Sequence, residues 1–199
     1  MSPLQKIAMG LVIVVGSALV PAHPSPGWAR YDVLADPVGW VLVLLGTFAL
    51  VRTEDAFASS RWTAAVAGVV SVPMWLPQVR HLLDASGQWA ASLPQIAFCL
   101  LLAHQVGTSA AQQSPRDAYV AKRFGLLVWG FGLLAVLPVV AIGGGVHALE
   151  PATATLSVLV DVAFVYYLFR VHRREWLGGP VPLEVRPRSR QEHDGRPPS

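Results

Sequence analysis

The chain has little charge and almost no cysteine for its 199 residues. Asp, Glu, Lys and Arg together make up 14% of it, against about 25% in an ordinary soluble domain. A soluble fold in which 53% of the residues are hydrophobic would lack the polar side chains needed to cover its surface. The single cysteine, Cys99, excludes an intrachain disulfide and a cysteine metal cluster. We therefore expect an all-α, polytopic membrane protein without a soluble domain.

Catalytic and cofactor motifs are also missing from the sequence. It contains no nucleophile elbow, phosphate loop, zinc-protease helix or dinucleotide fingerprint. Four possible metal ligands fall in the loops on one expected side of the membrane, without the short spacing of a metal site: His81, Asp84, His147 and Glu150. We therefore expect no enzyme activity, no metal site and no cofactor.

Six apolar stretches are candidates for membrane helices. A bilayer core of about 30 Å needs about 20 helical residues, with roughly 17 to 25 tolerated. The expected spans are residues 7–22, 37–51, 62–77, 89–107, 124–142 and 152–169. We expect them to form one bundle within residues 1–170, followed by a disordered basic tail over 171–199 that buries no apolar surface. The first span has an alternative interpretation as a cleaved signal peptide, because Val20-Pro21-Ala22 loosely resembles a cleavage site.

The basic residues are distributed unequally between the two sides of this arrangement. Thirteen of the fifteen Lys and Arg residues fall on one side, whereas Arg30 and Arg80 fall on the other. Lys and Arg in short loops resist translocation, so we expect a bacterial inner (plasma) membrane protein with both termini in the cytoplasm. Tryptophans near the expected span ends, including Trp40 and Trp89, are typical of anchors at the membrane surface.

The expected partners follow from the same distribution of charge. Arginines cluster in the tail and next to the spans, where they favour anionic lipid headgroups over nucleic acid. We therefore expect contact with the bilayer, anionic headgroups at the tail, and either a second copy of the chain or another membrane protein.

Asp161 lies near the centre of the last span, where an acidic side chain costs about 2.5 to 3.5 kcal/mol. Thr153 and Ser157 precede it at intervals of four residues, so the three share one face of the helix. Gln95 and His104 of the fourth span complete the candidate polar site, although His104 is placed nearer the inner end, as an interfacial histidine would be. The carboxyl group is interpreted either as a hydrogen-bonded lock between helices or as part of a proton or ion pathway.

Two Leu-Pro-Gln triplets, residues 76–78 and 93–95, flank the loop between the third and fourth spans. Proline frees a backbone carbonyl and kinks a helix, so we predict a hinge at Pro73, Pro77, Gln78 and Pro94. The triplets resemble the motif of PQ-loop transporters, which implies transport. That family has seven spans and carries its two motifs in separate three-helix repeats, so a simple pair of kinks is the alternative.

The second span opens with an acidic residue, proline, any residue, glycine and tryptophan. We expect Asp36 to cap the helix, Pro37 to occupy its first turn and Gly39 to admit a neighbouring helix. Gly46 of the same span, with Ala64 and Gly68 of the third, has the spacing of helix contacts. The opening segment resembles small, uncharacterised bacterial integral membrane proteins, a resemblance that implies no particular activity.

These features predict a class of protein more firmly than an activity. We expect a non-enzymatic membrane scaffold or accessory subunit. The alternative is a small transporter or proton-coupled permease that uses Asp161, since an acidic group inside a membrane marks a functional site by default.

Overall fold

The computed structural model describes residues 1–16, 19–20, 31–32 and 36–179. Seven α-helices account for most of this part of the chain: α1 (Pro3–Val15), α2 (Asp36–Val51), α3 (Ala58–Trp75), α4 (Pro77–Leu82), α5 (Ala85–Gln112), α6 (Ala118–Pro138) and α7 (Glu150–Val171). A π-helical turn, Val139–Gly143, continues α6, and 3₁₀ turns lie at Asp55–Phe57, His147–Leu149 and Glu175–Leu177. The two-residue strands β1 (Leu19–Val20) and β2 (Tyr31–Asp32) form one antiparallel pair. The predicted all-helical fold is confirmed apart from this pair.

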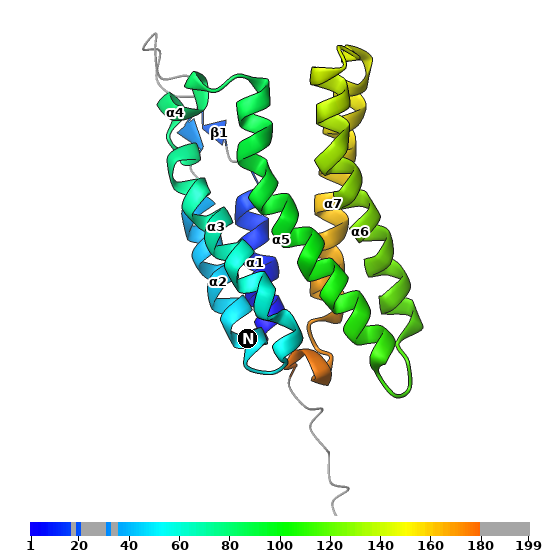
Figure 1. Cartoon of the computed structure of the whole chain (residues 1–199). Coiled ribbons are helices and arrows are strands. Elements are labelled where there is room, and N and C mark those ends of the chain that lie inside the picture. Colours follow the sequence, from blue (N-terminus) through cyan, green and yellow to red (C-terminus); the bar gives the residue numbers. More distant parts are fainter. Residues whose placement is uncertain (17–18, 21–30, 33–35, 180–199) are drawn as a thin grey trace, which may run out of the picture.

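The six longer helices form one bundle (Figure 1). Neighbours in the sequence are neighbours in space, because α1 contacts α2, α2 contacts α3, α3 contacts α5, α5 contacts α6 and α6 contacts α7. A further contact between α1 and α7 joins the first helix to the last. The helices therefore form a closed cycle.

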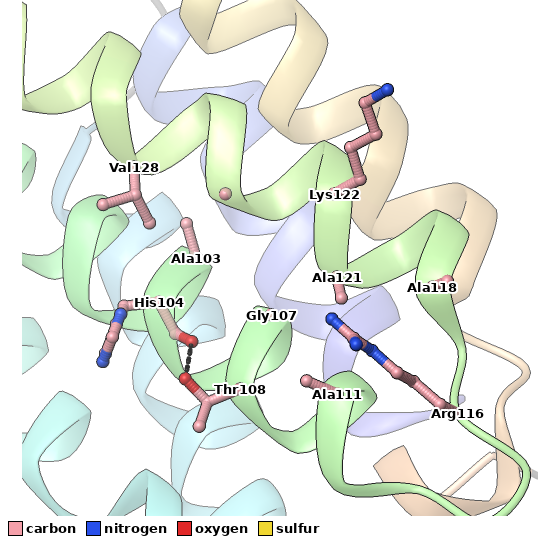
Figure 2. A pocket seen from close by; sticks show the side chains of 11 residues that line it. Ala103, His104, Gly107, Thr108, Ala111, Arg116, Ala118, Ala121, Lys122 and Val128 are labelled. Carbon is pink, nitrogen blue, oxygen red and sulfur yellow. Dashed lines mark hydrogen bonds between the residues drawn. The ribbon is translucent and has the colours of Figure 1, made fainter.

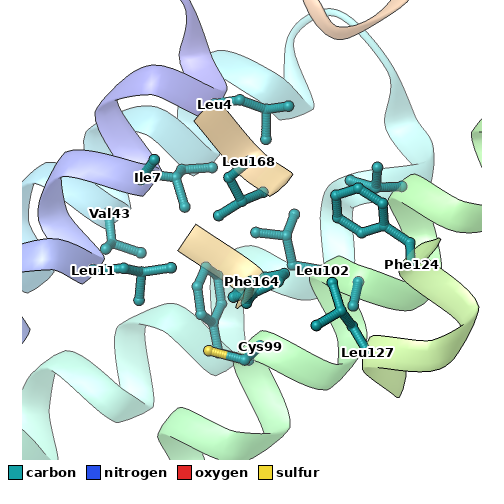
Figure 3. Close-up of a cluster of buried hydrophobic side chains, with 14 of the residues drawn as sticks. Leu4, Ile7, Leu11, Val43, Cys99, Leu102, Phe124, Leu127, Phe164 and Leu168 are labelled. Carbon is teal, nitrogen blue, oxygen red and sulfur yellow. The ribbon is translucent and has the colours of Figure 1, made fainter. Parts of the chain in front are cut away.

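The core lies where α1, α5, α6 and α7 meet (Figure 3). Leu4, Ile7 and Leu11 follow one another at the spacing of a helix face and are buried. They point toward Phe164 and Leu168 of α7, which are also buried (Figure 3). The α1–α7 contact is thus made by buried apolar side chains of both helices.

Trp40 belongs to this core and not to the membrane surface. Its side chain is only 2% exposed, and its ring packs edge to face against Phe98 of α5 at a centroid distance of 5.6 Å. The prediction of Trp40 as an interfacial anchor is wrong, because the ring of α2 reaches across to a buried aromatic partner that the sequence does not reveal.

Helices α5, α6 with its π-helical turn, and α7 are long and apolar enough to cross a membrane. Helices α1 and α2 are apolar but shorter, at 13 and 16 residues. The expected spans 37–51, 89–107, 124–142 and 152–169 each fall within helical structure. Three membrane-length helices are consistent with a membrane protein.

Two expected spans end earlier than predicted. Helix α1 ends at Val15, where Gly16 has an extended backbone, and Leu19–Val20 forms a strand pair, so the expected helix over 7–22 stops short of Val20. Residues 17–18 and 21–22 of that range lie outside the described residues, and with them Pro21 and Ala22 of the possible cleavage site. Helix α3 ends at Trp75 because Leu76 is extended, and Pro77 then begins α4.

Glycines place the backbones of α1 and α2 in direct contact. A Cβ atom built on Gly10 would lie 2.4 Å from the carbonyl oxygen of Gly39, and one on Gly39 would lie 2.7 Å from that of Gly10. About two turns further along α2, a Cβ on Gly46 would lie 2.7 Å from the carbonyl oxygen of Pro3. Gly39 and Gly46 therefore admit α1, while Asp36 and Pro37 form the first two residues of α2. Asp36, predicted to cap the helix from outside, is part of it.

The described basic residues gather at one end of the bundle, with Arg80 on α4 as the exception among them. Two contacts show which helix ends lie together there. Ser109 near the end of α5 donates a hydrogen bond of 2.9 Å to Glu54 beyond α2, and Arg174 beyond α7 forms a 2.8 Å ion pair with Asp117 ahead of α6. The ends of α2, α5 and α7 and the beginnings of α1, α3 and α6 thus share one end (Figure 1).

The described residues after α7, up to residue 179, include a buried turn. The 3₁₀ turn Glu175–Leu177 buries Leu177 completely. Gly178 has a positive φ of 72°, a conformation that favours glycine, and a Cβ built there would lie 3.2 Å from Pro3 and Thr53 side-chain atoms. The expectation that residues 171–199 bury no apolar surface is therefore wrong for 171–179, because Leu177 is fully buried and the neighbouring Gly178 lies close to Pro3 and Thr53. Residues 180–199 lie outside the described part.

Replacing Gly46 with Ala should destabilise the bundle by about 1 to 3 kcal/mol, because the added methyl group overlaps α1 backbone atoms that have no room to move. The measurement is thermal unfolding of the purified chain in detergent. The matched control is Gly132→Ala on α6, where nothing lies within 4 Å of a built Cβ; it should leave stability unchanged or raise it by up to ~1 kcal/mol. Equal melting temperatures for the two variants would contradict the α1–α2 contact.

Leu177→Ala should lower the unfolding free energy by about 2 to 5 kcal/mol, the usual cost of emptying a buried leucine site. Leu82→Ala serves as the control, because Leu82 is 84% exposed. Melting curves of the full chain in detergent compare the two. Should both variants melt with the wild-type chain, the segment after α7 would not be part of the folded bundle.

Candidate functional site

A cavity of about 140 Å³ lies between α5, α6 and α7. Ten residues line it: Trp89, Ser92, Gln95 and Ile96 of α5, Phe131, Leu134 and Pro138 of α6, and Thr153, Ser157 and Asp161 of α7. Four of the five residues predicted from the sequence as a polar site therefore face one cavity, namely Gln95, Thr153, Ser157 and Asp161. His104 does not.

Asp161 lies at the middle of α7, eleven residues after Glu150 and ten before Val171, or about 16 Å from either end. Its carboxylate accepts a hydrogen bond of 3.3 Å from the hydroxyl group of Ser157. Phe131 and Leu134 of α6 form an apolar wall of the same cavity. The carboxyl group is thus half-buried, next to both polar and apolar side chains.

Several polar groups of the cavity retain hydrogen-bonding capacity. The hydroxyl groups of Ser92 and Thr153 donate to backbone carbonyls of their own helices, at 2.7 and 2.8 Å, so their oxygen lone pairs remain as acceptors. The indole Nε1 of Trp89 is buried and donates to no group of the described residues. Water needs about two to four polar partners and at least ~10 to 15 Å³. The cavity meets both conditions for several water molecules.

The hydrogen bond of Asp161 stays within α7. A lock between helices would require a partner on α5 or α6, and the described hydrogen bonds give Asp161 none besides Ser157. This observation favours a carboxyl group that serves the cavity over one that joins helices.

Polar contacts between helices occur instead at the opposite end of α5. Gln105, only 9% exposed, accepts a hydrogen bond from the hydroxyl of Ser60 and donates one of 2.7 Å to Ser59. One turn later, Ser109 donates to Glu54. These contacts are not predicted from the sequence, although Gln105 and Ser109 have the four-residue spacing of a shared helix face. They join α3 and α5.

His104 lies on the exposed surface of α5, about 14 Å along the helix from Gln95. It lines a separate groove between α5 and α6 (Figure 2). The structure therefore does not bring His104 and Asp161 together.

The predicted hinge residues fall into two different settings. Pro73 lies in the last turn of α3, Leu76 interrupts the helix, and Pro77 starts α4, which includes Gln78. Helix α5, in contrast, continues through Pro94. The first Leu-Pro-Gln triplet thus coincides with a break between helices, and the second lies inside one helix.

The described residues form no group of three or more His, Cys, Asp or Glu side chains close enough to hold a metal ion, so we assign no metal ligands. Among known proteins, no family model, curated protein or solved structure matches the chain. The resemblances to PQ-loop transporters and to small bacterial membrane proteins therefore stay predictions, and the cavity between α5, α6 and α7 is the basis for assigning a function.

Proposed function

We propose that the chain is a six-span protein of a bacterial inner membrane, with its N- and C-termini in the cytoplasm. Three helices of membrane length support a membrane location. The gathering of described basic residues at one end of the bundle supports the orientation, since Lys and Arg stay on the cytoplasmic side.

Helices α1, α2 and α3 complete the six spans in this proposal. At 1.5 Å per residue, α1 and α2 measure about 20 and 24 Å, less than the ~30 Å core of a bilayer. Both pack against other helices of the bundle, and non-helical backbone is tolerated at membrane depth where protein covers it. Arg61 in the first turn of α3 lies 5.2 Å from the ring of Trp62, a pair suited to the membrane surface.

This orientation predicts which introduced cysteines react from outside the cell. Cysteine at Ser86, in the first turn of α5, should react with a membrane-impermeant thiol reagent in intact cells. Cysteine at Ser114, between α5 and α6, should react only after the cells are opened, because it lies at the basic end. The native Cys99 is buried, so the wild-type chain gives the background level of thiol labelling. Labelling of Ser114→Cys in intact cells would reverse the orientation.

We further propose that the protein is a small permease that moves protons or small cations, with Asp161 as the binding group. The observation that carries this proposal is the position of Asp161 at the middle of α7, in a cavity whose other polar groups come from α5 and α7. Acidic side chains at such depth line pathways for protons and ions.

The chemistry available at this cavity is the reversible charging of one carboxyl group. Ionised Asp161 would attract a proton or a small cation, and the Ser157 hydroxyl would stabilise the charge by donating to it. Proton uptake removes that charge, which lowers the cost of desolvation in an apolar setting. Cavity water held by Ser92, Gln95 and Thr153 would connect the carboxyl group to the end of the bundle opposite the basic residues.

A non-enzymatic scaffold or accessory subunit is the other function that we predict from the sequence. It requires Asp161 mainly as a structural group. The hydrogen bond within α7 gives this alternative less support than a bond between helices would, and the experiment below separates the two functions.

Asp161→Asn should abolish proton or cation flux while leaving stability within ~1 kcal/mol of the wild-type chain, because the amide keeps a similar size and hydrogen-bonding capacity but carries no charge. Flux is measured in proteoliposomes with an entrapped pH-sensitive dye and an imposed membrane potential, and stability by thermal unfolding in detergent.

The matched control is Asp55→Asn, because Asp55 is exposed at the basic end and has no described polar partner. It should retain full flux. Wild-type flux no greater than that of empty liposomes, or full flux in Asp161→Asn, would reject the permease and leave the scaffold. Asp161→Leu adds a further distinction, since a structural role predicts its marked destabilisation.

A further inference from the structure

A second hollow lies at the other end of the α5–α6 pair. This groove has a volume of about 380 Å³ and runs along the two helices beside the loop that joins them (Figure 2). Its floor consists of small residues of both helices, including Ala103, Gly107 and Ala111 of α5 and Ala121 and Gly125 of α6. A Cβ atom built on Gly125 would meet nothing within 4 Å, so the groove is open above that residue.

The rim of the groove at the loop is positively charged. Arg116 and Lys122 line it, and Figure 2 shows the guanidinium group of Arg116 directed across the groove toward Ala121, with Lys122 extended outward. The side chain of Arg116 makes no hydrogen bond or ion pair with another described residue, and its backbone carbonyl accepts one of 3.1 Å from the backbone N–H of Ala118. The nearest carboxylate in the sequence, that of Asp117, pairs with Arg174 at 2.8 Å. Among the described residues, the guanidinium group therefore faces the groove without an anionic partner.

The length of the groove matches one leaflet of a bilayer. Its lining on α6 extends from Ala118 to Val128, ten residues or about 15 Å of helix, which is half of a ~30 Å hydrocarbon core. Arg116 and Lys122 lie toward one end of this length, and the rest is lined mainly by small and apolar residues, with His104 and Thr108 as its polar side chains. An anionic phospholipid has the same division into headgroup and acyl chain.

We infer that this groove binds one anionic phospholipid of the cytoplasmic leaflet, with its phosphate on Arg116, its charge further balanced by Lys122, and an acyl chain along the α5–α6 floor. The inference rests on the proposed membrane location but is independent of Asp161. Basic pockets between membrane helices on the cytoplasmic side suit such headgroups.

The test is native mass spectrometry of the full chain in a non-ionic detergent, titrated with phosphatidylglycerol or with phosphatidylcholine of the same acyl chains. The wild-type chain should bind one phosphatidylglycerol more tightly than phosphatidylcholine. Arg116→Gln should raise the Kd for phosphatidylglycerol about 5-fold, the effect of one basic residue near an anionic surface. Arg52→Gln, which removes an exposed charge from the same end of the bundle, should change that Kd less than 2-fold.

Gly125→Leu tests the apolar part of the groove without altering charge. The added side chain enters open space, so the melting temperature should not fall, whereas the lipid Kd should rise at least as much as in Arg116→Gln. If this variant fails to fold, the comparison of the lipid Kd values of Arg116→Gln and Arg52→Gln tests the inference. The permease variant Asp161→Asn should keep lipid binding, which separates failure of this inference from failure of the proposed function.

Three outcomes would overturn the inference. Phosphatidylglycerol that binds no tighter than phosphatidylcholine would remove the headgroup contact. An equal loss in Arg116→Gln and Arg52→Gln would assign binding to surface charge in general. Displacement of the lipid by millimolar inorganic phosphate, with the same dependence on Arg116, would identify a site for soluble phosphate instead.

Discussion

The direct backbone contact between α1 and α2 is the constraint on which the bundle depends. Gly10, Gly39 and Gly46 bring the two helices closer than any side chain would allow, and that approach positions the apolar face of α1 against α7. Because α1 touches both the second helix and the last, it completes the cycle of helices. Helices α5, α6 and α7 then hold a fixed relation to one another, and this relation creates both the cavity at Asp161 and the groove at Arg116.

The sequence predicts the features that repeat at helical spacing. Thr153, Ser157 and Asp161 face one cavity because a four-residue interval keeps side chains on one face, and Gly39 and Gly46 admit a neighbour for the same reason. It does not predict features that depend on a distant partner. Trp40 is buried against Phe98, which lies far along the chain, and Leu177 is buried beyond the end of α7. In the sequence alone, Trp40 near a span end looks like a surface anchor, and Leu177 in a Pro- and Arg-rich segment looks like part of a disordered tail.

The two ends of α5 differ in how their polar groups are used. At the basic end, Gln105 and Ser109 bond to residues of other segments, which ties α5 to α3. At the cavity, the hydroxyl groups of Ser92, Thr153 and Ser157 bond within their own helices. The side-chain hydrogen bonds that join α5 to α3 therefore lie away from Asp161. A cavity can persist between α5 and α7 because the polar side chains there do not draw the helices together.

The contact between α1 and α7 also bears on the order of assembly during synthesis. Helices α1 and α2 are made first and can pair at once through their glycines. The apolar face that α1 turns toward α7, including Leu4 and Leu11, lacks its α7 partner until residues 150–177 leave the ribosome. The nascent chain is thus an open arrangement of helices that closes only when its last helix arrives.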